Sequence, residues 1–205
     1  MHTKRLSLIP YVLCVLVISI CPGRAAIADQ TAMDNDKAAI LSEINAARTK
    51  DIDARVDKFI ADYGGQPLCC EALYTIAGAF EEQKEFTRSK QTYQRIVSLF
   101  PNCSCYEDAR IGAAKADVLY LIEAGADAQA AIEKLTADSA QNPNLARALY
   151  EAAERYERKK NFDKAVEIYR LSGEKGAGTI YADSAPLDIQ KVAILKAIET
   201  GPGCL

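Results

Sequence analysis

Residues 72–86 read ALYTIAGAFEEQKEF, and 76 positions later residues 148–162 read ALYEAAERYERKKNF. The register holds without a gap, and it aligns small residues with small residues and aromatic residues with aromatic residues. Ala77 aligns with Ala153, for example, and Phe80 aligns with Tyr156. Self-similarity at a fixed spacing indicates a protein built from repeated structural units.

Each copy has the hydrophobic spacing of two helices joined by a short turn. In residues 71–83 the apolar positions from Leu73 to Phe80 recur at intervals of three and four, which places them on one helix face. Residues 86–100 repeat this spacing, and Pro101 ends it. Because only two residues separate the two segments of each copy, the sequence predicts antiparallel helical hairpins.

The residues at the packing positions resemble the tetratricopeptide repeat (TPR) family. Units of that family carry a bulky apolar residue, then small and aromatic residues at fixed places, and a closing proline. The small residues let two helices approach closely, and the aromatic residues fill the space between hairpins. These places hold Leu73, Ala77, Phe80, Phe86, Ser89, Tyr93 and Pro101 in the first copy, and Leu149, Ala153, Tyr156, Phe162, Ala165 and Tyr169 in the second.

Both copies also depart from the TPR pattern. Lys84 and Lys160 stand where the family favours glycine at the turn, and Ala177 replaces the closing proline of the second copy. Between the copies lies a degenerate unit, in which we expect two helices separated by a break at Gly125. The predicted helices of this unit cover residues 107–123 and 127–140.

The resemblance implies an all-α fold, a TPR-like α-solenoid of about three antiparallel helix pairs with capping helices at both ends. Single repeats cannot bury their apolar faces alone, so the units must stack. The last cap is expected to open at Ser184 and Pro186. The expected segments are a signal peptide (1–28), one or two N-terminal capping helices (29–66), repeats (67–103, 104–143 and 144–183), and a C-terminal capping helix with its tail (184–205).

The N-terminal residues have the pattern of a secretory signal peptide. Lys4 and Arg5 precede an apolar run, and Ala26-Ile27-Ala28 supplies the small residues of a cleavage site before Asp29. The run has about 15 residues, fewer than the roughly 20 of a membrane-spanning helix. We therefore expect a protein exported to the periplasm or outside the cell, with no membrane span after cleavage. The alternative is a lipoprotein acylated on Cys21, although no small residue precedes that cysteine.

The composition argues against catalysis and against nucleic-acid binding. With 25 basic and 28 acidic residues, the net charge of −3 gives no basic footprint. His2 is the only histidine and leaves with the predicted signal peptide, so no nucleophile has a histidine base. The run Gly176-Ala177-Gly178 lacks the Lys-Ser/Thr that completes a phosphate loop, which indicates a turn. We expect a protein that is not an enzyme, has no catalytic residues and needs no cofactor.

Five cysteines follow the predicted cleavage site. Cys69 and Cys70 begin the first hairpin, and Cys103 and Cys105 follow its end, so they are expected at the same edge. Because thiols pair in oxidising compartments, we expect at least one disulfide from Cys69 or Cys70 to Cys103 or Cys105. A cysteine-dependent metal or redox protein is the alternative, but the C-x-x-C spacing is missing, so no metal is predicted. Cys204 is the odd cysteine, either free or bonded to another chain.

In stacked hairpins of the TPR kind, the first helices line the concave side. The resemblance therefore implies a non-enzymatic scaffold that binds another protein or peptide on this side. Acidic groups dominate the expected surface, which favours a basic or neutral partner. For Tyr74 and Tyr150, packing between hairpins is an equal alternative to partner binding. The expected binding surface comprises Tyr74, Glu81, Glu82, Tyr150, Glu154 and Arg158.

Overall fold

The computed structural model describes residues 22–48, 50–140 and 142–201, with side chains from Asp29 onward. Within these ranges the chain forms nine helices and no strands, so the predicted all-α fold is confirmed. The helices are α1 (Pro22–Asn45), α2 (Ile52–Tyr63), α3 (Cys69–Glu82), α4 (Phe86–Leu99), α5 (Tyr106–Glu123), α6 (Gln129–Asp138), α7 (Leu145–Arg158), α8 (Phe162–Lys175) and α9 (Ile180–Thr200).

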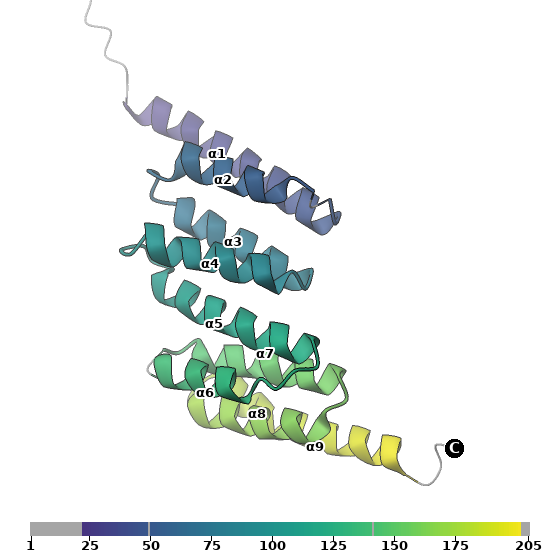
Figure 1. The fold of residues 1–205 in the computed structure, drawn as a ribbon. Coiled ribbons are helices and arrows are strands. Elements are labelled where there is room, and N and C mark those ends of the chain that lie inside the picture. The colour runs from purple at the N-terminus through teal and green to yellow at the C-terminus, as the bar shows by residue number, and fades with distance from the viewer. Residues whose placement is uncertain (1–21, 49, 141, 202–205) are drawn as a thin grey trace, which may run out of the picture.

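The helices stack in chain order into an elongated solenoid (Figure 1). Helix α1 packs against α2 and α3, and α4 packs against α3 and α5. Helix α5 also contacts α7 and the short helix α6. At the C-terminal end, α9 covers α7 and α8. This arrangement is the TPR-like solenoid that the sequence predicts.

The two sequence copies fold into matching hairpins. Helices α3 and α7 begin and end at residues 76 apart, as do α4 and α8. Phe80 and Tyr156 are both buried at equivalent places. Tyr74 meets the ring of Tyr93 edge-on at 5.2 Å between centroids, and the equivalent pair in the second copy repeats this contact at 5.1 Å. Equivalent residues thus have equivalent neighbours.

Four turns with the same backbone geometry end the first helix of each pair. Ala47, Lys84, Gly125 and Lys160 have positive φ angles of 53°, 62°, 70° and 60°. In each turn the next residue's N–H donates to the carbonyl five residues earlier, at 2.8–2.9 Å, which caps the helix. Lys84 and Lys160 therefore adopt the left-handed backbone conformation for which the family favours glycine at this position. For a residue with a Cβ, this conformation costs about 1–2 kcal/mol.

The N-terminal region is a further hairpin. Helices α1 and α2 are separate, because the turn at Ala47 ends α1 as the equivalent turns end α3, α5 and α7. Met33, Ile40 and Ile44 of α1 are buried in the core. The expected signal peptide lies largely outside the described residues, although α1 begins at Pro22, before the expected cleavage site. Among the described residues, no helix is both long enough and apolar enough to span a membrane.

The last helix begins earlier than the sequence predicts. Thr179 has an extended backbone, as residues that precede a helix commonly do, so α9 starts at Ile180 instead of Ser184. Pro186 consequently lies inside the helix, where its nitrogen cannot donate to the carbonyl of Ala182. The expected boundary at residue 184 falls within α9.

Two apolar cores meet at α5. One core runs from α1 to Ala109 at the start of α5, and the other joins Phe86 of α4 to residues between Ile111 of α5 and Val192 of α9. Since α5 is covered on several sides, its buried residues form no single stripe. This burial explains why the middle unit shows the repeat pattern poorly, although its two helices and the break at Gly125 are found close to their predicted places.

Candidate functional site

A groove of about 600 Å³ opens along the first helices of the hairpins. Helices α3, α5 and α7 supply most of its lining, and Leu41 and Asn45 of α1 close one end. Gly78 lies in this lining, and a side chain added there would meet no atom within 4 Å. The residues of the expected binding surface that line the groove are Tyr74, Glu81, Glu82, Glu154 and Arg158.

Tyr150, the sixth expected residue, does not line the groove. Its ring packs against Tyr169 and Tyr181, and its hydroxyl donates a hydrogen bond to Asp188 of α9. The early start of α9 places this helix over the position that Tyr150 was expected to expose. The half-buried ring of Tyr74 packs on Tyr93 and also lines the groove.

Lys115 of α5 is the centre of the groove's charge network. Its side chain is only 10% exposed, and its Nζ lies 3.0 Å from Glu81 of α3 and hydrogen-bonds Glu151 of α7. Arg147 binds the other oxygen of Glu151 at 2.8 Å. One buried ammonium thus joins three helices, including helices from both sequence copies.

The charges in this network shift one another's pKa. Burial raises the pKa of Glu81 above its ordinary value, although Lys115 opposes the shift. Burial lowers the pKa of Lys115, but the two carboxylates outweigh burial and raise it. Burial also acts to raise the pKa of Glu151, yet Lys115 and Arg147 outweigh it and lower that pKa. Lys115 therefore stays charged, and Glu81 is the most easily protonated carboxylate of the network.

The remaining charges leave one end of the groove open to a ligand. Arg155 is held by Glu123 at 3.2 Å and lies over the ring of Phe86, 5.3 Å from its centroid. Arg158 and Glu154 form only a loose, half-exposed pair at 3.9 Å. Exposed Glu82 has no ion-pair partner in the part of the chain that the structure describes.

Acidic groups do not dominate the groove, which corrects the expectation from the sequence. Four basic residues balance the four glutamates in its lining. Lys115, Arg147 and Arg155 were missing from the expected surface because the middle unit was poorly defined and because the helix faces of α7 were assigned by analogy. The sequence holds a weak signal for Lys115, which shares the otherwise apolar run from Gly112 to Leu119 with one other charged residue, Asp117. The groove can bind polar groups of either sign.

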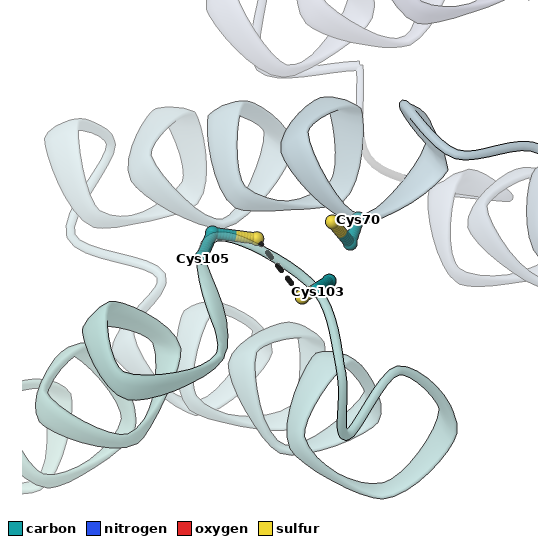
Figure 2. A group of neighbouring side chains, drawn as sticks. All are labelled: Cys70, Cys103 and Cys105. Carbon is teal, nitrogen blue, oxygen red and sulfur yellow. Dashed lines mark hydrogen bonds between the residues drawn. The ribbon is translucent and has the colours of Figure 1, made fainter.

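The four cysteines near the first hairpin are free thiols, so the expected disulfide bond is not found among the described residues. Cys70 of α3 nevertheless lies beside Cys103 and Cys105 of the loop before α5, as Figure 2 shows. Cys69 is buried outside this group of three sulfur atoms. The sequence thus predicts correctly that the two pairs of cysteines lie at the same edge of the first hairpin, but it does not identify which thiols are adjacent.

The fold and the groove define a helical-repeat protein whose first helices line a shared groove. Residues 71–102, which cover most of α3 and all of α4, match the family model of the tetratricopeptide repeat. The chain therefore contains a repeat of the TPR family, typical of scaffolds for protein–protein interaction. Comparisons with curated proteins and with solved structures gave no match.

Proposed function

We propose that this protein is an exported, non-enzymatic scaffold that holds a segment of another protein in the groove of α3, α5 and α7. The observation that carries the proposal is the shared lining, in which side chains of three first helices from separate hairpins face one hollow. The signal-peptide pattern of residues 1–28 supports export. The TPR match supports a protein partner rather than a small-molecule substrate.

The groove's chemistry suggests the character of the bound segment. Because two glutamates already compensate the charge of Lys115, this lysine is a poor clamp for a ligand carboxylate. Glu82 and the hydroxyl of Tyr74 are the groups most available to a ligand at the α3 side, where a basic or hydrogen-bonding side chain would fit. The loose pair of Arg158 and Glu154 offers both charges at the α7 side. A polar segment of mixed charge matches these positions.

Gly78→Phe is expected to abolish partner binding while leaving the fold intact. A Cβ at residue 78 enters open space in the groove lining, so we expect the phenyl ring beyond it to occupy the groove. The measurement is quantitative capture of partners from the envelope and culture-medium fractions, wild type against variant, with circular dichroism to check folding. Partners of the groove should be depleted at least tenfold.

The matched control is Arg170→Phe, which adds the same ring to an exposed position of α8 outside the groove lining. Proteins lost with Gly78→Phe but kept with Arg170→Phe are groove partners. Equal capture by all three chains would show that binding does not use the groove.

Export predicts a mature chain that begins at Asp29. Intact-mass analysis of the protein from fractionated cells should give a free N-terminus at this residue and no lipid. A chain acylated on Cys21 would replace the proposal with the membrane-tethered alternative, and an uncleaved cytosolic chain would contradict export altogether.

A further inference from the structure

Three thiols converge where α3 meets the loop between α4 and α5. The sulfur atoms of Cys70, Cys103 and Cys105 all lie within 4.8 Å of one another, and those of Cys103 and Cys105 are 3.4 Å apart. Cys70 and Cys105 are buried, whereas Cys103 is partly exposed and leaves a path from solvent. Figure 2 shows the three side chains pointing toward one another from two separate segments.

The spacing fits one metal ion bound by three sulfurs. Ligands about 2.3 Å from a metal in a trigonal arrangement lie about 4 Å from one another, within the range of the observed group. A disulfide, by contrast, would join two of the thiols and leave the third buried against it. The odd number of sulfurs in contact is therefore better accounted for by coordination than by pairing.

We propose that Cys70, Cys103 and Cys105 form a binding site for Cu(I). Soft thiolates select Cu(I), which accepts three sulfur ligands, whereas structural zinc takes four ligands. Within the described residues, no histidine, carboxylate or fourth cysteine completes the group. None of the three cysteines lines the groove, so this proposal does not rest on the proposed function.

The helix ends supply part of the charge that such a site needs. Cys70 is the second residue of α3, and Cys105 directly precedes α5, so two helix N-termini with their partial positive charge meet at the thiols. Burial raises the pKa of both the Cys70 and the Cys105 thiol above the ordinary value, so these thiols are protonated before an ion binds. On binding, the thiol protons pass to solvent and sulfur lone pairs coordinate the ion, with no electron transferred.

The test is titration of the full chain with Cu(I), after reduction and under nitrogen, against a chromophoric Cu(I) chelator. We expect one Cu(I) per chain, and X-ray absorption should show three sulfur neighbours. Replacing Cys70, Cys103 or Cys105 singly by alanine should weaken binding by more than about 100-fold. Removing a residue that only hydrogen-bonds to a metal ligand already weakens binding by about 10- to 100-fold, and removing the ligand itself should cost more. Cys103→Ala is the safest variant for folding, since Cys103 is not fully buried.

Cys69→Ala is the matched control, because Cys69 adjoins Cys70 on α3 and is buried, yet its sulfur is not in the group. This variant should bind Cu(I) like the wild type. The proposal is overturned if Cys103→Ala binds as tightly as the wild type, or if the site holds Zn(II) in preference to Cu(I). It is also overturned if two of the three sulfurs form a disulfide in the exported chain and the reduced chain does not bind Cu(I).

Discussion

Lys115→Met is expected to destabilise the protein by about 3–5 kcal/mol at neutral pH, because removing one partner of a buried ion pair leaves the other charge uncompensated. Methionine keeps most of the apolar stem of lysine, so the loss is chiefly electrostatic. The uncompensated carboxylate is Glu81, whose Oε1 is buried without a hydrogen-bond partner in the described part of the chain. Glu151 retains Arg147. Chemical denaturation monitored by circular dichroism measures the effect.

The loss should depend on pH with a definite sign. Burial already raises the pKa of Glu81 in the folded wild type, and removal of Lys115 takes away the group that opposes this shift. A carboxyl whose pKa is higher in the folded state binds a proton more readily there, so its protonation favours folding as the pH falls. The variant's deficit relative to wild type should therefore shrink from pH 7 toward about pH 5.

Two further variants distinguish the effect of burying an ion pair from the effect of removing a charge. Lys90→Met removes the half-exposed lysine that pairs with Asp117 at 2.7 Å, and it should cost no more than about 1 kcal/mol. The double variant Lys115→Met with Glu81→Gln removes the stranded charge and should recover much of the lost stability. A Lys115→Met chain that loses no more than Lys90→Met would show that the buried pair does not form in solution.

The sequence predicts the hairpins well, because they depend on the spacing of apolar residues within a short segment of the chain. Helices α3, α4, α7 and α8 follow from apolar intervals and small-residue positions that repeat at one offset, because each copy must present the same face to its neighbours. The turns at Lys84 and Lys160 show that the backbone pattern holds even where the favoured glycine is absent. Repetition in the sequence is thus strong evidence for repetition in packing.

The candidate site depends on relations between repeats, which no local pattern encodes. Lys115 of α5 forms ion pairs with residues of α3 and α7, and its two partners are 34 and 36 residues away in the chain. For Tyr150 the sequence left partner binding and packing between hairpins as equal alternatives, and the structure packs it against α8 and α9. The terminal helix and the irregular middle unit are the parts that lack a second copy, and there the sequence predicts least.

The polar network also connects helices that belong to the two apolar cores. Cys105 and Ala109 of α5 belong to the N-terminal core, whereas Ile111 and Val118 belong to the C-terminal core. Lys115 of α5 thus joins α3, whose buried residues belong to the N-terminal core, to α7, whose buried residues belong to the C-terminal core. Since both halves line the groove, the ion pairs that stabilise the fold also set the distance between the groove's walls.

Two identical substitutions on neighbouring first helices are expected to have opposite effects. Gly112→Ala on α5 would place its Cβ 2.7–2.8 Å from three ring atoms of Tyr93, closer than atoms can approach. Tyr93 is buried and packed against Tyr74, so its ring cannot move without disturbing the core. We expect a net loss of about 1–3 kcal/mol, because this overpacking exceeds the gain in helix propensity.

Gly78→Ala on α3 places its Cβ in open space, so only the propensity gain remains, about 0.5–1 kcal/mol of added stability. Denaturation of both variants in one buffer measures the difference in sign. A Tyr93→Leu background identifies the cause, since with the ring removed Gly112→Ala should cost less than it does in the wild type. If both alanines stabilise the chain equally, α5 does not approach α4 as closely as the structure shows, and the glycine at residue 112 has no packing role.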